Sequence, residues 1–272
     1  MRIVKIGHSD LNAENEITKN IPFECSLEIA PGLGQVKFNS ITVKGYILAE
    51  AGSGIESEEW IKAEQWIKAG GGIKADRGIE AGGWIEANGQ IEAGEGIKSG
   101  WSLHSGKGII AGEGIRAERD ILAGEDIKAG LWIKAGDQIE AGWGIEAWEG
   151  IKAGWGIKAK NWIKAGGKIE AEDGIEAGWG IEAWENIKAG WGIAAGWGIK
   201  AGDQIEAGWG IRAERDIVSG LHITCKTLNC KLRIFVGTAN WKTVNQNERT
   251  LTCEDYTGEL ACGTFKKISC DF

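Results

Sequence analysis

Several residue types are scarce in this 272-residue chain, which has only two prolines, three histidines and no long apolar run. A membrane-spanning helix requires roughly 18 consecutive apolar residues, and no run of the sequence approaches that length. The first residues, Met1 to His8, lack the apolar core of a secretory signal peptide, and we therefore expect a cytoplasmic, intracellular location. Of the three histidines, His104 stands where we expect a lone solvated side chain, and paired carboxylates such as Glu58-Glu59 are expected to be solvated as well; we therefore expect no catalytic constellation and a protein that is not an enzyme.

A basic surface is also missing. The formal net charge is −8, the pI is about 5.2, and Lys and Glu alternate along the chain. A nucleic-acid-binding protein needs a basic face that neutralises phosphates. The sequence therefore predicts no nucleic-acid partner and no membrane partner.

The cysteines do not have the spacing of a metal site. Four residues separate Cys225 from Cys230, whereas common zinc sites use two, and no closely spaced His pair accompanies them. Reduced thiols, disulfides and a zinc site stay open as alternatives for the six cysteines. We assign no metal ligand and no cofactor from the sequence.

What the chain has in abundance is a six-residue repeat. Ile recurs at every sixth position from Ile61 to Ile217, with Leu103 as the only substitute, which gives 27 hexads. Ala holds the third place in all hexads except those with Ser99, Ser105 and Ser219. A helix cannot keep a six-residue stripe on one face, whereas a strand places Ile and the Ala two residues later on the same side. The Gly residues that often follow suit the unusual dihedral angles of a corner. The repeat predicts an all-β fold, a parallel β-solenoid.

Charge signs give the number of hexads in a coil. The residue after each Ile points outward, and its charge changes sign in blocks of three, as in Lys152 to Lys164 and Glu170 to Glu182. With three hexads per coil, vertical neighbours form 13 opposite-charge and 3 like-charge pairs, whereas two hexads per coil give 10 and 7. Opposite charges on neighbouring strands stabilise and like charges destabilise. The sequence therefore predicts a three-sided coil in an 18-residue register and about nine regular coils.

The positions at which the six-residue pattern begins and ends divide the chain into three segments. We predict an N-terminal cap with the first coil at 1–54, the regular solenoid at 55–222, and a Cys-containing β cap or subdomain at 223–272. Eight residues separate Ile47 from Ile55, which indicates a two-residue corner insertion. Solenoid ends expose apolar core and strand edges, so we expect small β segments to cap both ends.

Tryptophan is the candidate for a binding surface. Of 15 Trp residues, 14 lie between Trp60 and Trp209, mostly at the fourth to sixth hexad places, which form the corners. In the 18-residue register, two rows fall on single corners: Trp143, Trp162, Trp179 and Trp197, and Trp66, Trp84 and Trp101. These rows are compatible with a platform that stacks sugar rings, or with indoles that lie over charged side chains and support the corners.

Two aliphatic residues, Ile110 and Leu122, stand where the repeat otherwise places charge. They are compatible with a patch for a protein partner or for self-association. Isolated exposed aliphatic residues are also common on protein surfaces without any function.

The hexads resemble two families. Gly150-Ile151-Lys152-Ala153 and Asn186-Ile187-Lys188-Ala189 resemble the repeats of the bactofilins, bacterial scaffold proteins with a three-sided β-helix core; the resemblance covers residues 55–222 and implies an intracellular structural scaffold. The repeat also resembles that of hexapeptide acyltransferases, although their small residue precedes the aliphatic one by two places and here it follows. We expect a non-enzymatic scaffold or protein-interaction rod, with a carbohydrate-binding solenoid that uses its Trp corners and a hexapeptide-repeat acyltransferase as alternatives.

Overall fold

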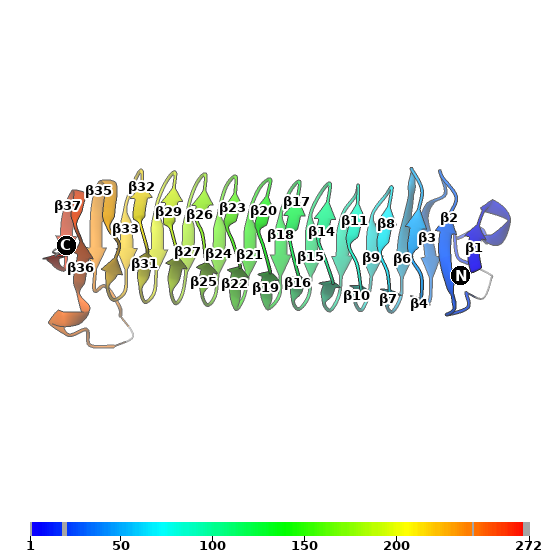
Figure 1. Cartoon of the computed structure of the whole chain (residues 1–272), viewed down its shortest axis with the longest axis horizontal. Coiled ribbons are helices and arrows are strands. Elements are labelled where there is room, and N and C mark those ends of the chain that lie inside the picture. Colours follow the sequence, from blue (N-terminus) through cyan, green and yellow to red (C-terminus); the bar gives the residue numbers. More distant parts are fainter. Residues whose placement is uncertain (1, 18–20, 241, 269–272) are drawn as a thin grey trace. The chain divides into compact units, whose positions relative to one another are not determined.

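In the computed structural model, each Ile-x-Ala tripeptide of the repeat is one short β-strand (Figure 1). Ile and Ala are buried and the residue between them is not, because successive side chains of a strand point to opposite sides. The structure describes residues 2–17, 21–240 and 242–268. It comprises two units, residues 1–136 (unit 1) and 137–272 (unit 2), and each is described by itself.

Unit 1 has three parallel sheets, and from β2 onward consecutive strands along the chain belong to different sheets. The first sheet contains β4 (Ile41–Val43), β7 (Ile61–Ala63), β10 (Ile79–Ala81), β13 (Ile97–Ser99), β16 (Ile115–Ala117) and β19 (Trp132–Ala135). The second contains β1 (Arg2–Ile6), β2 (Cys25–Ile29), β5 (Ile47–Ala49), β8 (Ile67–Ala69), β11 (Ile85–Ala87), β14 (Leu103–Ser105) and β17 (Ile121–Ala123). The third contains β3 (Gly34–Phe38), β6 (Ser53–Ser57), β9 (Ile73–Ala75), β12 (Ile91–Ala93), β15 (Ile109–Ala111) and β18 (Ile127–Ala129).

Unit 2 repeats this arrangement. Its first sheet contains β22 (Gly150–Ala153), β25 (Ile169–Ala171), β28 (Ile187–Ala189), β31 (Ile205–Ala207), β34 (Ile223–Thr224), β36 (Thr250–Cys253) and β38 (Thr264–Lys267). The second contains β20 (Ile139–Ala141), β23 (Ile157–Ala159), β26 (Ile175–Ala177), β29 (Gly192–Ala195), β32 (Gly210–Ala213), β35 (Thr227–Val236) and β37 (Asp255–Cys262). The third contains β21 (Ile145–Ala147), β24 (Ile163–Ala165), β27 (Ile181–Ala183), β30 (Ile199–Ala201), β33 (Ile217–Ser219) and the second half of β35.

The predicted 18-residue register is confirmed. Lys152 lies beside Glu170 and Glu170 beside Lys188 on successive strands of the first sheet of unit 2. Ion pairs of 3.0 Å between Lys152 and Glu170 and 3.1 Å between Lys188 and Glu206 occupy the outward positions. Inside, the three Ser residues of the repeat satisfy their hydroxyls with backbone carbonyls; Ser99, for example, donates to Gly83 O at 2.8 Å.

The number of coils exceeds the prediction. We predicted about nine, and the described residues form about 13 turns, because both flanking segments contribute strands that pair in parallel with the repeat. In the N-terminal flank, Val36 and Phe38 of β3 are buried inside the coil, although this strand does not have the Ile-x-Ala sequence. A coil forms where buried and exposed side chains alternate along its strands, and it does not require the exact six-residue sequence. Strands of both flanks therefore extend the solenoid. The predicted boundaries at 54/55 and 222/223 mark the positions where the hexad sequence begins and ends. The division of the chain into three segments at these positions stays a prediction.

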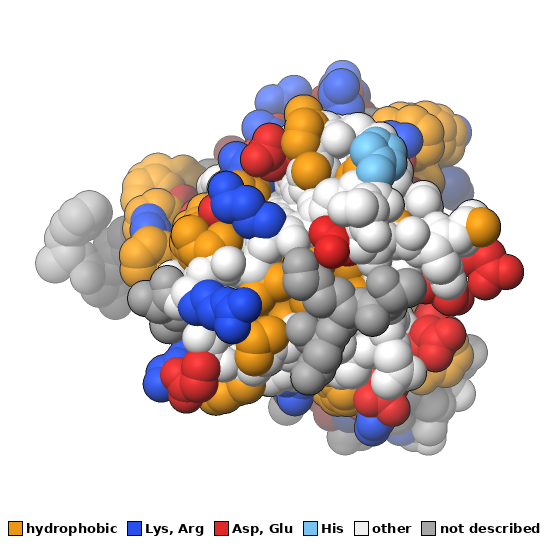
Figure 2. All heavy atoms as spheres, turned by 90° about the vertical axis from the view of Figure 1, so that its right-hand side faces the viewer, with side chains coloured by type: hydrophobic (Ala, Val, Ile, Leu, Met, Phe, Trp, Pro, Cys, Tyr) orange, Lys and Arg blue, Asp and Glu red, His pale blue; other side chains and the backbone are white. Residues whose placement is uncertain are grey.

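Two short 3₁₀ segments, η1 (His8–Asp10) and η2 (Gln246–Glu248), are the helical elements of the described residues. Within those residues no helix has the length and apolar character of a membrane span. Figure 2 faces the end at which β1 lies and shows acidic and basic side chains interspersed around its rim, in agreement with the alternating charge of the sequence.

Glycine serves the corners differently from our prediction. No described Gly of the regular repeat has a positive φ; the positive values belong to Gly52, in the predicted two-residue insertion, and to five other Gly residues of the flanks. At many of the fourth hexad places that carry Gly, a Cβ would overlap the carbonyl of the preceding coil, as at Gly178, where the Lys160 oxygen would be 2.0 Å away. Nine of the 27 fourth places carry a side chain instead, among them Trp148 and Trp184. Close approach of coils therefore explains these glycines.

Two glycines of one corner test this explanation. Gly178→Ala should lower the free energy of unfolding by about 1–3 kcal/mol, because the added methyl group forces two coils apart. Gly180→Ala is the matched control, since its Cβ would meet the Gly198 oxygen at 3.4 Å, an ordinary contact. Urea unfolding measures both, and equal losses of stability would contradict a steric role for the fourth place.

Candidate ligand-binding surface

The exposure of each tryptophan depends on its place in the hexad. At the sixth place, directly before Ile, Trp60, Trp66, Trp84 and Trp162 are half-buried. At the fourth and fifth places the indoles are 53–70% exposed: Trp101, Trp143, Trp148, Trp155, Trp179, Trp184, Trp191, Trp197 and Trp209. The first group supports corners, and the second is available to a ligand.

The sixth-place indoles lie over glycines of a neighbouring coil. Trp60 covers Gly78, Trp132 covers Gly114 and Trp162 covers Gly144, where a Cβ would approach the rings to 2.3–2.5 Å. Such flat packing on the backbone removes apolar ring area from water. These three indoles therefore pack against the backbone of a neighbouring coil.

The predicted row Trp66, Trp84 and Trp101 is divided between the two groups. Tyr46, Trp66 and Trp84 form a continuous stack, with ring centroids 4.4 and 4.9 Å apart and interplanar angles of 3° and 4°. Trp101 stands one hexad place earlier and is 58% exposed. The stacked rings pack against one another along the corner and stabilise it, whereas Trp101 is exposed.

The other predicted row, on one corner of unit 2, is divided as well. Trp179 and Trp197 stack with centroids 5.7 Å apart, and the Arg215 guanidinium lies 4.9 Å from the Trp197 ring. Trp162 covers a glycine, and Trp143 is exposed. These four residues share a corner, as predicted, without forming one continuous platform.

Ile110 and Leu122 do not share a surface. Ile110 lies on β15 in the third sheet of unit 1, in register between Glu92 and Lys128. Leu122 lies on β17 in the second sheet, beside His104. The Nε2 atom of His104 is screened from solvent and, among the described residues, has no hydrogen-bond partner. A joint patch is not formed, because consecutive hexads face different sides of the coil.

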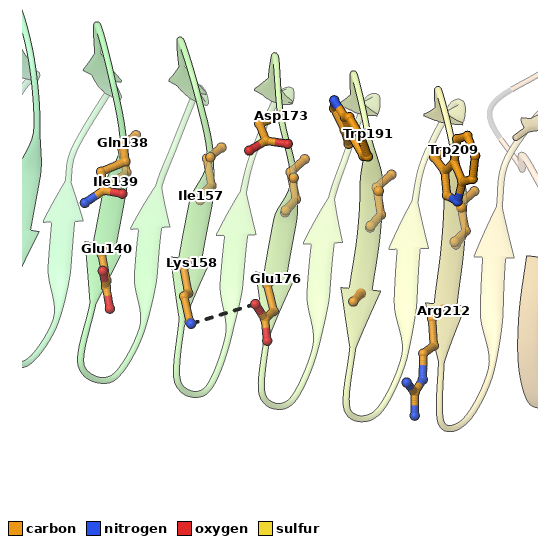
Figure 3. Close-up of a pocket in the computed structure, with 18 of the residues that line it drawn as sticks. Gln138, Ile139, Glu140, Ile157, Lys158, Asp173, Glu176, Trp191, Trp209 and Arg212 are labelled. Atoms are coloured by element: carbon orange, nitrogen blue, oxygen red, sulfur yellow. Dashed lines mark ion pairs between the residues drawn. The ribbon is translucent and has the colours of Figure 1, made fainter.

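A groove lies on the second sheet of unit 2 (Figure 3). It has a volume of about 610 Å³ and crosses strands β20 to β35. In Figure 3, Trp191 and Trp209 lie along one side, at the corner, and Glu140, Lys158, Glu176 and Arg212 lie along the other. The groove thus combines exposed aromatic rings with charged side chains.

Missing side chains leave this groove open. Four successive coils have Gly at the sixth hexad place next to the exposed indoles: Gly156, Gly174, Gly192 and Gly210. A Cβ at these positions would have its nearest neighbour at 3.0–3.5 Å, so the fold does not exclude a side chain there. Indeed, the same place in unit 1 carries the side chains of Trp66, Trp84, Ser102 and Asp120.

The outward ladder also has a gap at this point. Ala194 stands between Glu176 and Arg212 in the strand register, where the repeat otherwise places a charged side chain. Glu176 pairs with Lys158 at 3.9 Å and Arg212 with Glu214 at 3.1 Å, each away from the gap. The space above Ala194 is therefore part of the groove.

Sequence reasoning missed the two indoles of this groove. We searched for Trp in successive coils, and Asp173 interrupts the row between Trp155 and Trp191. The signal that could have revealed the site was the run of sixth-place glycines together with Ala194. Both departures from the repeat remove side chains on one side of unit 2.

The cysteines form a separate feature. Cys25, Cys225, Cys230, Cys253 and Cys262 are free thiols, whereas Cys270 lies outside the described residues. Burial, with a smaller contribution from neighbouring Cys253, raises the pKa of the Cys225 thiol to about 12. A thiol with such a pKa is protonated at neutral pH and a poor nucleophile or metal ligand. In the described parts of the chain, no group of His, Cys, Asp and Glu side chains is arranged to hold a metal ion.

Comparison with known proteins gives no relative for this chain. No protein family matches its sequence, no curated protein is significantly similar to it, and no solved structure matches its fold. The parallel β-solenoid therefore stands on the structure alone, and neither of the two resemblances of the hexads is established as a family membership.

Two indoles of one corner test the division by hexad place. Trp143→Ala should change the free energy of unfolding by no more than about 0.5 kcal/mol, because the ring is exposed. Trp162→Ala should lower it by about 1–3 kcal/mol, since it uncovers Gly144 and removes a half-buried ring. Chemical denaturation of both variants provides the comparison, and a greater loss in Trp143→Ala would refute the assignment.

Proposed function

We propose that the protein is a non-enzymatic scaffold that presents exposed tryptophans to a binding partner. The observation that carries this proposal is the exposure of the indoles at the fourth and fifth hexad places, at 53–70%. Large aromatic side chains in water are unfavourable for solubility, and aromatic residues are enriched where proteins bind partners. The partner is a protein or a glycan.

The construction of the coils supports a scaffold role. Corner amides bond to the coil before them, as in the bond of 3.1 Å from Gly178 N to Ala159 O and that of 2.7 Å from Trp179 N to Asn161 O. Each exposed indole is therefore attached to a corner whose backbone is held by its neighbours. Binding residues on such a support keep fixed spacings, and this lowers the entropic cost of binding.

An intracellular location is part of the same proposal. Free thiols at the five described cysteines are what a reducing compartment maintains. In unit 1, His8 lies in η1 and His104 in β14, two different elements, and in unit 2 His222 is the single histidine, directly before β34; this distribution supports a role without general acid–base catalysis.

Retention of ligands on the immobilised chain tests the proposal. We expect wild-type protein to retain a protein or glycan ligand, and a variant with all fourth- and fifth-place indoles of unit 2 replaced by Ala to lose it: Trp143, Trp148, Trp155, Trp179, Trp184, Trp191, Trp197 and Trp209. Circular dichroism checks that the variant keeps its strands. Equal retention by both proteins, or retention by neither, would overturn the proposal.

A further inference from the structure

We infer that the groove on the second sheet of unit 2 binds a linear, uncharged oligosaccharide. This inference deepens the proposed function and rests on it, since it takes the exposed indoles to be ligand contacts. The groove crosses strands β20 to β35, with Trp191 and Trp209 on one side and four charged side chains on the other (Figure 3).

The aromatic side of the groove suits the faces of sugar rings. Trp191 and Trp209 are 64% and 56% exposed. Their ring centroids are 6.2 Å apart with an interplanar angle of 26°, so the two rings stack on each other, and the Lys226 ammonium lies 4.5 Å from the centroid of the Trp209 ring. The exposed parts of the two rings are what a ligand can contact. The face of an indole carries partial negative charge. The C–H groups on the face of a pyranose carry partial positive charge, so the two surfaces attract while both leave water.

The polar side suits hydroxyl groups. Glu140 and Glu176 offer acceptors, Lys158 and Arg212 offer donors, and Asn229 offers both. A sugar hydroxyl is a donor and an acceptor and can therefore pair with either kind of group. Few, well-placed polar groups around an apolar surface are what orients a ligand in a binding site.

The direction of the groove favours a linear chain. It runs across successive strands of one sheet, which are about 4.8 Å apart. Successive rings of an extended oligosaccharide have a similar spacing, so successive rings can lie over successive coils, whose side chains differ. Ala194 and the four sixth-place glycines leave room for this chain against the sheet.

Other occupants fit the groove less well. Three of its side chains are acidic and two are basic, namely Glu140, Asp173 and Glu176 against Lys158 and Arg212. In a protein of net charge −8, this balance repels phosphates and disfavours a nucleic acid. An extended peptide would add to a sheet edge, whereas β26, β29 and β32 each lie between two paired strands in the middle of a sheet.

Binding of defined hexasaccharides tests the inference. The probes are cellohexaose, xylohexaose, mannohexaose and chitohexaose, titrated against the full chain by calorimetry and by tryptophan fluorescence; a DNA oligonucleotide, a hexagalacturonate and an unstructured peptide serve as comparisons. We expect at least one uncharged hexasaccharide to bind at a single saturable site. The charged probes and the peptide should bind more weakly.

Three variants locate the site. Ala194→Lys fills the groove and restores the Ile-Lys-Ala spelling of the neighbouring hexads, with its ammonium beside Glu176, so it should fold normally and weaken binding by about tenfold or more. Trp209→Ala should weaken binding by about tenfold, the loss that removal of one stacking ring gives. Ile110→Lys, which also restores an Ile-Lys-Ala tripeptide but at an outward position on the third sheet of unit 1, should bind like wild type.

The outcomes separate the inference from the proposed function. Binding that is unchanged in Ala194→Lys and Trp209→Ala, or weakened equally in Ile110→Lys, would overturn the groove as the site. If no hexasaccharide binds but the immobilised chain retains a protein in a Trp-dependent way, the inference fails and the scaffold proposal stands. If no ligand of any class is retained, both fail.

Discussion

Stacking of one coil on the next in an 18-residue register is the constraint on which every other feature of this protein depends. Each inward Ile lies beside the Ile of the next coil, as Ile157 lies beside Ile175, and the parallel backbone bonds fix that register. A shift by one residue would turn all Ile and Ala side chains to water. Because the register is strict, residues three hexads apart become neighbours, and this single rule places Lys152 beside Glu170 and Trp191 close to Trp209.

Glycine occurs at two places of the hexad for two different physical reasons. At Gly178 and other glycines of the fourth hexad place, the coils approach so closely that a Cβ would overlap a carbonyl, although the coils accept a side chain at other fourth places such as Trp148 and Trp184. At the sixth place beside the groove, Gly174 would accept a Cβ at an ordinary contact distance of 3.5 Å. Its absence of a side chain therefore shapes a surface and is not required by coil packing. This difference connects the repeat to the binding role that we propose.

The sequence predicted the class of the fold and the coil length, because the outward charges reveal which residues are vertical neighbours. It did not predict the number of coils, since Val36 and Phe38 preserve alternating burial without the hexad spelling. It predicted that the Trp residues of each row share a corner. It did not predict that the exposure of an indole changes between neighbouring places of the hexad: Trp162, at the sixth place, is half-buried, whereas Trp143, at the fifth place, is exposed. The sequence analysis did not predict the groove, because the groove forms where glycines and Ala194 stand in place of residues with larger side chains.

Spin labels at paired positions of unit 2 test the register most directly. Labels in Lys158→Cys/Glu176→Cys, three hexads apart, should show strong dipolar broadening, because the two positions face each other on neighbouring strands. Labels in Lys158→Cys/Glu170→Cys, two hexads apart, should show much less, since these positions belong to different sheets. Both pairs are introduced into a chain whose native cysteines are replaced by Ala or Val. Stronger broadening in the second pair than in the first would contradict the three-sided coil and the groove built on it.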